Sequence, residues 1–536
     1  MVFHRFSVSY LIIAVSAVLT GLCFTWYNVG FAVLFTVIPF FYVLLRDAEK
    51  EKNPFRFYAY GYVWGAFFYA SIFYWFIYQY PLDYLGLSKL EAVGFVFLTC
   101  IGTGLLLSVI LALWPFLTVL FIRSRLCREH GWLFIPFTAC LYVLTEFAFT
   151  LGPFAVPWAK LAVTWQSNIF SIQSASLFGS YFISFIIIVI NASLAYGLYR
   201  LFSHKSKRAL PVCAAVSAAL FLSNMGVGAI LYRADERITD ELPKYTASAL
   251  QGNMISGKAN PGVDATADLF LSMAKDEIEA CGSKLIVMPE GCFAEDVDKD
   301  PQLLQKLKDF SAQNDVILIF GCYEHTSDGK FYNSTWCVSP DGSMTGPYRK
   351  QHPVPFGEFT PGKEIILKVL PFLEDLTEIG GDLDAGTEST VFDSTLGKAG
   401  SFICFDSAFE QIGFEQTRSG ATVLTESTND SWWYDSAQLY QHNGHAILRA
   451  VEGRRYVVRS SSAGYSTVID SRGNILAGVD ALTAGLATAD VAGRSDLSFY
   501  HKTPYLFVSV SAVFALSCFA AAAVYKKRTK SAKLKK

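Results

Sequence analysis

Charged residues are scarce in this chain of 536 residues: they make up 17% of it, against about 25% in a soluble globular protein. The net charge is −2 and no basic or acidic half stands out, which argues against nucleic acid as a partner. Hydrophobic residues account for 52% of the chain and aromatic residues for 15%, and the mean hydropathy is +0.34. This composition is typical of a membrane protein, and the length leaves room for a full-sized soluble domain as well.

Paired cysteine motifs are also missing. The eleven cysteines are scattered, without a CxxC pair or a metal-type spacing, so the sequence predicts neither a disulfide-dense scaffold nor a metal site, and no cofactor. A small-residue signal-peptidase site does not follow the first apolar stretch, so this stretch is expected to remain as a membrane span.

Long apolar runs, by contrast, are frequent. A helix needs about 20 apolar residues to cross the hydrocarbon core of a bilayer. Eight candidate spans are present: 8–26, 28–45, 57–80, 90–122, 132–151, 170–202, 209–232 and 506–525. We therefore expect a membrane domain of seven helices over residues 1–232, an extracytoplasmic domain over 233–503, and an eighth helix with a basic cytoplasmic tail over 504–536.

The basic residues of the loops predict the orientation. Lys and Arg favour the cytoplasmic side of a membrane. They cluster after the second, fourth, sixth and eighth predicted spans, whereas the alternate loops contain only Lys89 and Lys160. This alternation predicts cytoplasmic termini and a domain on the outer, periplasmic side of the cell (inner) membrane. Disulfides are allowed there, but the five cysteines of that domain cannot all pair, and Cys404 is the candidate for a free thiol.

The domain over 233–503 alternates short β-rich runs with amphipathic helical stretches, which predicts a layered α/β domain. "DVILIFGCYEH" and "FYNSTWCVSP" are expected to pair as antiparallel strands, and "AGYSTVIDSRGNIL" as a hairpin. Residues that could take part in catalysis lie at the ends of the predicted strands. Glu290 ends "LIVMPE", Cys404 ends "GSFIC", and Lys350 lies in a loop rich in Pro and Gly.

A glutamate, a lysine and a cysteine suffice for acyl transfer. The carboxylate accepts the thiol proton, the thiolate attacks a carbonyl carbon, and the ammonium stabilises the oxyanion. Each residue also has a simpler explanation. A buried cysteine after an apolar strand is inert more often than reactive, by about 5:1, and a glutamate or lysine in a loop is usually solvated surface.

Three ordered motifs, "LIVMPEG", "YRKQHPVPFGEFTP" and "GSFICFD", resemble the Glu, Lys and Cys motifs of the carbon–nitrogen hydrolase (nitrilase) superfamily. "LQGN", "STNDSWW" and "QHNGHAILRAVEGRRYVVRSSSAGYS" fit the same pattern. Seven spans before such a domain and one after it are similar to the membrane branch of that superfamily, the apolipoprotein N-acyltransferases. The resemblance implies an αββα sandwich carried by the membrane helices.

The resemblance also implies roles for single residues. Glu290 would be the general base, Cys404 the nucleophile and Lys350 the oxyanion stabiliser, while Glu358 matches a second glutamate near the active site. The family moves an acyl chain from a membrane phospholipid onto the cysteine as a thioester, and then onto the α-amine of the diacylglyceryl-cysteine that begins a lipoprotein. The implied partners are therefore a phospholipid donor, a lipoprotein N-terminus and the lipid bilayer.

Three positions depart from the family pattern. Phe405 and Asp406 follow the nucleophile where Tyr and Glu are usual, and Lys258 is followed by Ala259 instead of Trp. Together with Trp432, which could line an acyl pocket or serve as ordinary packing, Phe405 and Asp406 are candidate substrate-binding residues. The departures are expected to affect lipid preference and efficiency more than the class of reaction.

Two other functions stay open. A membrane-tethered amidase would use the same three residues with water as the second acceptor, and a degenerate relative would act as a lipid- or lipoprotein-binding scaffold. His442 and His445 have no further metal ligands nearby and are expected to be structural or surface residues. Glu426 and Asp430 are expected at a strand end and in a turn.

Overall fold

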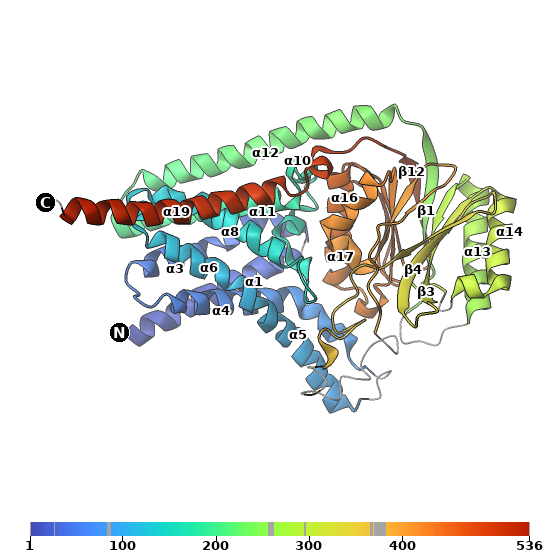
Figure 1. Ribbon diagram of the computed structural model, residues 1–536, viewed down its shortest axis with the longest axis horizontal. Coiled ribbons are helices and arrows are strands. Elements are labelled where there is room, and N and C mark those ends of the chain that lie inside the picture. The colour runs from blue at the N-terminus through green and yellow to red at the C-terminus, as the bar shows by residue number, and fades with distance from the viewer. Residues whose placement is uncertain are drawn as a thin grey trace.

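The computed structural model describes residues 2–25, 27–82, 87–255, 262–293, 296–364, 368 and 382–534. Figure 1 shows a bundle of long helices and an α/β domain arranged one after the other along the longest axis. Both termini lie at the end of the bundle away from the α/β domain. The predicted departure at Ala259, with the preceding Lys258, lies outside the described residues.

The bundle contains most of the helices before the first strand, together with the last helix of the chain. Its members are α1 (Val2–Thr25), α2 (Val33–Thr36), α3 (Ile38–Ala48), α4 (Phe55–Ile72), α5 (Lys89–Leu111), α6 (Leu113–Ile122), α7 (Arg125–Glu129), α8 (Phe134–Ala148), α9 (Ile169–Ile172), α10 (Ala175–Phe178), α11 (Ser180–His204), α12 (Ala209–Asp240) and α19 (Leu506–Leu534).

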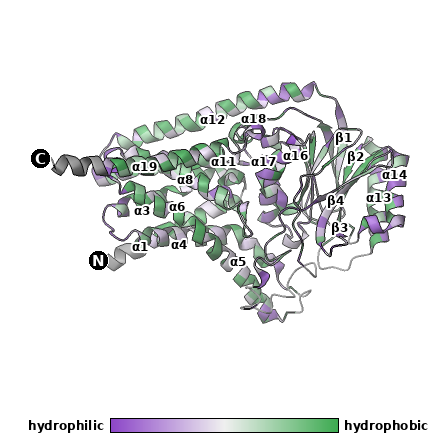
Figure 2. Cartoon of the chain, in the orientation of Figure 1, coloured by the Kyte–Doolittle hydropathy of each residue, from purple (hydrophilic) through white to green (hydrophobic). Residues whose placement is uncertain are grey.

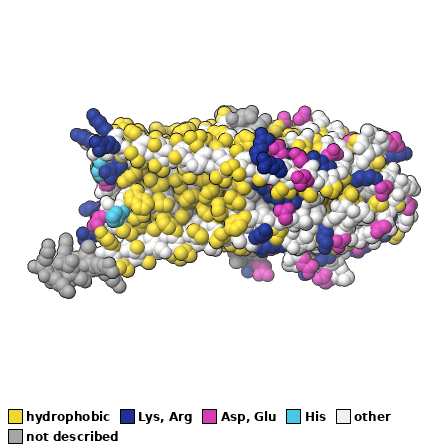
Figure 3. All heavy atoms as spheres, turned by 90° about the horizontal axis from the view of Figure 1, so that it is seen from above, with side chains coloured by type: hydrophobic (Ala, Val, Ile, Leu, Met, Phe, Trp, Pro, Cys, Tyr) yellow, Lys and Arg dark blue, Asp and Glu magenta, His cyan; other side chains and the backbone are white. Residues whose placement is uncertain are grey.

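Seven segments of the described chain are long and apolar enough to cross a membrane: Val8–Thr25, Val29–Ala48, Lys89–Ile122, Gly131–Ala148, Ser180–His204, Ala209–Asp240 and Leu506–Lys526. Figure 2 shows hydrophobic residues along the bundle helices and more hydrophilic ones on the α/β domain. In Figure 3 apolar side chains cover the visible face of the bundle, with Lys and Arg gathered at its far end. A lipid-facing surface explains these exposed apolar side chains, because water would oppose them.

The predicted count of eight spans is not confirmed, because the third, over 57–80, is not among the seven. That segment forms α4 and then the 3-10 helix η2 (Phe73–Gln79). α4 packs between α1 and α5. Its sequence is rich in Tyr and Gly and includes Arg56, which lowers its average hydropathy although Trp64 and Phe68 are buried. Packing against neighbouring helices, rather than hydropathy, therefore places α4 in the bundle.

The longest helix, α12, runs along the outside of the bundle to the α/β domain (Figure 1). It continues past residue 232, where the sequence predicted the membrane domain to end, as far as Asp240. Asp235 lies in this extension and pairs with Arg494, and it also accepts a hydrogen bond from Ser471. The end of α12 is thereby held against the α/β domain.

The α/β domain contains two six-stranded sheets, in the orders β12-β1-β2-β3-β4-β5 and β11-β10-β9-β8-β7-β6. The first is formed by β1 (Lys244–Gln251), β2 (Leu285–Val287), β3 (Ile317–His325), β4 (Phe331–Val338), β5 (Met344–Arg349) and β12 (Gly485–Ala492). The second is formed by β6 (Val391–Phe392), β7 (Ala399–Ile403), β8 (Val423–Thr428), β9 (Val457–Ser461), β10 (Ser466–Ile469) and β11 (Ile475–Val479).

The two sheets pack against each other and helices cover their outer faces. α13 (Val263–Cys281) and α14 (Pro301–Asn314) contact the first sheet, whereas α16 (Glu410–Arg418) and α17 (Ala437–Gly453) contact the second, on the side of the bundle (Figure 1). Every residue of β7 and β8 is buried, as expected for parallel strands covered on both faces. This αββα arrangement is the one that the resemblance implied.

Local predictions in this domain are confirmed where the pattern was strong. β3 and β4 pair antiparallel, from Leu318 opposite Val338 to His325 opposite Phe331. β10 and β11 form the predicted hairpin, and its turn contains Gly473 at a φ of +90°, which a glycine adopts without strain.

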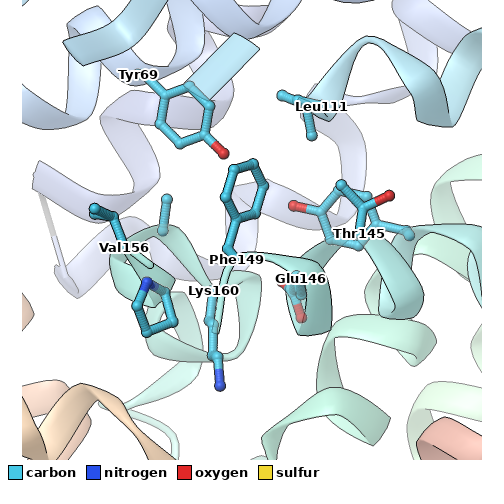
Figure 4. A pocket seen from close by; sticks show the side chains of 10 residues that line it. Tyr69, Leu111, Thr145, Glu146, Phe149, Val156 and Lys160 are labelled. Atoms are coloured by element: carbon cyan, nitrogen blue, oxygen red, sulfur yellow. The ribbon is translucent and has the colours of Figure 1, made fainter. Parts of the chain in front are cut away.

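The bundle and the α/β domain meet at a buried cluster of charges. The Lys160 ammonium, on the loop between α8 and α9, contacts the carboxylate of Glu410 at the start of α16 and lies 4.4 Å from the Tyr181 ring centre. Ser180 at the start of α11 also donates a hydrogen bond to Glu410, 2.7 Å long. Figure 4 shows the Lys160 side chain pointing out of the small cavity that Tyr69 and other residues line.

We expect Lys160→Met to lower the free energy of unfolding by about 3–5 kcal/mol, because it leaves the buried carboxylate of Glu410 without its closest cation. Denaturant unfolding of the full chain in detergent measures this loss. Lys284→Met is the matched control, since Lys284 forms an exposed pair with Asp315 and its removal should cost at most about 1 kcal/mol. Equal stability of the two variants would contradict the expectation.

Candidate active site

Strand ends of the two sheets position the candidate catalytic residues. Glu290 follows β2 and Lys350 directly follows β5, both in the first sheet, whereas Cys404 directly follows β7 in the second sheet. Side-chain hydrogen bonds also join the sheets nearby: Ser427 donates to the carbonyl oxygen of Met288 at 2.8 Å. The three side chains therefore meet at the interface between the sheets, at the ends of their strands.

Lys350 is the centre of the charged part of the site. Its ammonium donates to Glu290 Oε1 at 3.0 Å and to Glu358 Oε1 at 2.7 Å, and the lysine is 1% exposed. Asn333 on β4 donates to the same oxygen of Glu290 at 2.7 Å. The second oxygen of Glu358 accepts the backbone N–H of Val354 at 2.7 Å. Each glutamate is therefore fixed by two donors, one of which is the lysine.

The charges of the two glutamates decide the protonation of the lysine. Burial lowers the pKa of Lys350, but the negative charges of Glu290 and Glu358 raise it more, so that it ends well above its usual value. Burial raises the pKa of Glu358, an effect that Lys350 opposes and Glu290 reinforces. The lysine is consequently an ammonium ion at neutral pH, which is the form that stabilises an oxyanion.

Cys404 adopts a backbone conformation that is unusual for a cysteine. Its φ is +52°, in the left-handed region, directly after the last residue of β7. Its carbonyl oxygen accepts hydrogen bonds from His442 Nε2 at 3.0 Å and from the Ser407 hydroxyl at 3.1 Å. Such a conformation costs energy, and these two bonds hold it in place.

The thiol of Cys404 is half-buried and, within the described residues, is not part of a disulfide. Burial and then the negative charge of Glu290 raise the pKa of Cys404 well above its usual value, and Lys350 opposes this rise. The thiol is therefore protonated at rest. Attack by the sulfur would require a base to take this proton, and the negative charge of Glu290 acts on the thiol.

A buried ionic cluster lies next to Cys404, which it contacts through His442. His442 Nδ1 donates to Asp430 Oδ1 at 2.7 Å, and Arg459 donates to Asp430 Oδ2 at 2.6 Å. Glu426 lies 3.2 Å from both His442 Nε2 and Arg459 Nε. Burial lowers the pKa of His442, but Asp430 raises it more, to about 9, so the ring is an imidazolium that donates from both nitrogens.

Sequence reasoning did not foresee this cluster. It treated His442 as a structural or surface residue and gave Glu426 and Asp430 separate local roles, whereas the structure joins all three to Arg459 behind Cys404. The sequence offered little signal, since Glu426 on β8, His442 on α17, Arg459 on β9 and Asp430, just after β8, all have polar neighbours in the chain.

We expect His442→Gln to reduce kcat by about 100-fold with little change in KM, because Cys404 loses the imidazolium that fixes its carbonyl oxygen. Steady-state kinetics and the rate of alkylation of Cys404 by iodoacetamide measure the effect. His445→Gln is the matched control: His445 is also buried on α17, but it bonds the carbonyl oxygen of Trp158 instead. Equal losses of kcat in the two variants would show that His442 contributes only to packing.

An aromatic wall stands beside the nucleophile and is built from both parts of the molecule. Trp75 on η2 and Trp158 on η5 (Pro157–Ala159) both donate to Gln441 Oε1, at 3.1 Å and 2.8 Å. The ring of Trp158 stacks on Phe405, with centroids 6.0 Å apart. Trp433 packs edge-on against Trp75 at 4.3 Å. Loops of the bundle thus cover the site with apolar surface.

Two family models cover most of the chain: the apolipoprotein N-acyltransferase N-terminal domain matches residues 16–193, and carbon-nitrogen hydrolase matches residues 246–496. An apolipoprotein N-acyltransferase of Geobacter metallireducens is 28% identical over 88% of this chain and 87% of its own length. The chain belongs to the apolipoprotein N-acyltransferase family. Apolipoprotein N-acyltransferase 1 of Treponema denticola is 26% identical over 94% of each chain.

Two solved structures show partial similarity to this apolipoprotein N-acyltransferase family member. Nit3 of Saccharomyces cerevisiae, a member of the nitrilase superfamily, shares 22% identity over 49% of this chain and 96% of its own, with a TM-score of 0.38. A carbon-nitrogen hydrolase of Helicobacter pylori G27 shares 15% identity over 46% of this chain and 89% of its own, with a TM-score of 0.36.

The three candidate substrate-binding residues, Phe405, Asp406 and Trp432, occupy different environments. Asp406 is fully buried and accepts hydrogen bonds from the Tyr348 hydroxyl at 2.8 Å and from the backbone N–H of His352 at 2.9 Å. It therefore fixes the segment on both sides of Lys350. Phe405 belongs to the aromatic wall. Trp432 is half-buried in η10 (Ser431–Trp433).

Proposed function

We propose that this protein transfers an acyl chain from a membrane phospholipid to the α-amino group of the diacylglyceryl-cysteine that begins lipoproteins. The proposal rests above all on the Lys350 ammonium, which bridges the buried Glu290 and the half-buried Glu358 near the protonated thiol of Cys404. Lipoprotein N-acylation is also the activity that the names of its relatives carry. The aromatic wall and the adjoining apolar bundle suit substrates that are anchored in lipid.

The first half-reaction would load the cysteine. Glu290 accepts the thiol proton of Cys404 while the sulfur attacks the ester carbonyl carbon of the phospholipid. The ammonium of Lys350 stabilises the negative oxygen of the tetrahedral intermediate. When the intermediate collapses, the carbon–oxygen bond breaks, and the lysophospholipid leaves with the proton held by Glu290. The acyl chain remains on Cys404 as a thioester.

The second half-reaction would transfer the acyl chain from Cys404 to the lipoprotein. The neutral α-amine of the lipoprotein attacks the thioester carbonyl carbon, and Lys350 again stabilises the oxyanion. The carbon–sulfur bond then breaks, and Glu290 takes the excess proton from the nitrogen and returns it to the sulfur of Cys404. A thioester suits this sequence because it keeps the acyl group reactive while one lipid leaves and the next arrives.

The orientation in the membrane is part of the proposal. We propose that both termini face the cytoplasm and that the α/β domain stands on the outer side of the inner membrane. The clusters of Lys and Arg after alternate spans support this orientation, as does the position of both termini at one end of the bundle (Figure 1). If both termini lie on the same side of the membrane, the number of crossings is even. The seven apolar segments and α4 would together make eight crossings.

Mass spectrometry of a two-substrate reaction tests the function. The purified chain is mixed with a phospholipid that carries a deuterated acyl chain and with a diacylglyceryl peptide. The proposal predicts a deuterated N-acyl peptide, and a deuterated acyl mass on Cys404 when the peptide is omitted. Free deuterated fatty acid as the main product would indicate the amidase alternative instead, and the absence of any acyl adduct would indicate a scaffold.

A further inference from the structure

A cavity of about 490 Å³ lies at the end of the bundle away from the α/β domain. It is formed where α3, α6, α8 and α11 end or begin, and α7 closes one side. Its lining includes three arginines: Arg123, Arg128 and Arg200. Figure 3 shows Lys, Arg and His side chains gathered at this end, next to the apolar surface of the bundle.

The positive charge of the cavity is not neutralised by the protein. In the part of the chain that the structure describes, no carboxylate oxygen lies within ion-pair distance of Arg123, Arg128 or Arg200. The lining contains one acidic residue, Glu49, and its carboxylate is engaged by the Tyr199 hydroxyl and lies 3.2 Å from His204 Nε2. The arginines therefore leave a net positive field in the cavity.

Arg123 donates to the carbonyl oxygens of Ala48, Glu51 and Lys52, whereas the other two arginines keep donors for a ligand. Arg200 donates from Nη1 to the Tyr196 hydroxyl at 3.2 Å, while its buried Nε has no hydrogen-bond partner among the described residues. Arg128 uses Nε and Nη2 on the carbonyl oxygen of Arg123, and its side chain is otherwise exposed. A buried N–H without an acceptor is costly, and an anion in the cavity would supply that acceptor.

Another part of the lining is apolar and includes Leu45, Ile122 and Phe134. We propose that this cavity binds the phosphate-bearing headgroup of an anionic phospholipid, whose acyl chains lie along the apolar surface of the bundle. Arginine matches phosphate because its planar guanidinium donates two parallel hydrogen bonds. The ends of membrane helices are also the depth at which lipid phosphates lie. The inference is independent of the proposed reaction, which takes place at the other end of the molecule.

Native mass spectrometry of the full chain tests this site. The protein carries Cys404→Ala, so that no acyl group is transferred, and it is freed of lipid in a neutral detergent. Dialkyl-ether phosphatidylglycerol, phosphatidylcholine with the same chains, and inorganic phosphate are each titrated. We expect phosphatidylglycerol to bind most tightly. The paired substitution Arg128→Gln and Arg200→Gln should weaken that binding about 25-fold, at about fivefold for each arginine.

Arg125→Gln is the matched control, because Arg125 lies on α7 beside Arg128 but pairs with Glu129 outside the cavity. The single variant Arg128→Gln changes an exposed side chain and should therefore fold normally. Its affinity for phosphatidylglycerol should fall about fivefold. Equal affinity of wild type and the paired variant for phosphatidylglycerol would overturn the proposal. Tight binding of inorganic phosphate without a preference for the lipid would also overturn it, in favour of a site for a soluble anion.

Discussion

Cys404→Ala is expected to reduce acyl transfer to less than about one ten-thousandth of the wild-type rate, because no other group can form the thioester. The bonds from His442 and Ser407 are made to the carbonyl oxygen of residue 404, which the substitution keeps. The variant should therefore fold normally. The rate of N-acyl peptide formation and the intact mass of the protein after incubation with phospholipid measure the effect.

Replacement of a second accessible cysteine is the control for Cys404→Ala. Cys281 lies at the end of α13, is exposed, and is the other accessible thiol on the outer part of the α/β domain. Cys281→Ala should keep the wild-type rate and the acyl mass on the protein. Full activity of Cys404→Ala would remove the nucleophile assignment, and with it the two-step mechanism. An acyl mass that survives in Cys404→Ala would place the thioester on another cysteine.

Lys350→Met is expected to lower kcat by about 100- to 1,000-fold, since the oxyanion loses the ammonium that the proposed mechanism places beside it. The same change removes the cation between Glu290 and Glu358 and should cost about 3–5 kcal/mol in the free energy of unfolding. Without Lys350, burial and the negative charge of Glu290 hold the pKa of Glu358 above its unfolded value. The stability of the variant should therefore be highest below about pH 4.5 and fall as the pH rises.

Two further variants separate these effects. Glu358→Ala removes one acceptor of the Lys350 ammonium and the acceptor of the Val354 N–H, so we expect a large loss of rate in a chain that remains folded. Glu358→Gln keeps a neutral oxygen for the Val354 N–H and should lose less. Wild-type rates in Glu358→Ala would restrict that glutamate to a structural role. A Lys350→Met variant with an unchanged rate would exclude its action on the oxyanion.

Local patterns were sufficient for most of the α/β domain. The pairing of β3 with β4 and the hairpin of β10 and β11 followed from their strand patterns and turn residues. β7 was predictable from the short run "GSFIC" that ends at Cys404. The pairing of β12 with β1 was not, since it joins residues more than 200 positions apart and depends on closure of the whole sheet.

In the bundle, local patterns were not sufficient. Hydropathy averages identified seven long apolar segments, but the number of crossings depends on α4, whose tyrosines lower its average while its neighbours bury it. Likewise, no average over a window reveals that Lys160 would be buried against Glu410, 250 residues later, since both residues look like ordinary surface charges.

By itself, the sequence determined the class of the protein, the α/β layers and the order of three reactive residue types along the chain, since composition, periodicity and strand-end motifs are properties of short segments. Only the tertiary structure decided that Lys350 bridges two glutamates, that His442 holds the backbone of Cys404, and that loops of the bundle wall the site. Those contacts join residues from different sheets and from both ends of the chain, and their energies depend on burial, which arises only when the whole chain is packed.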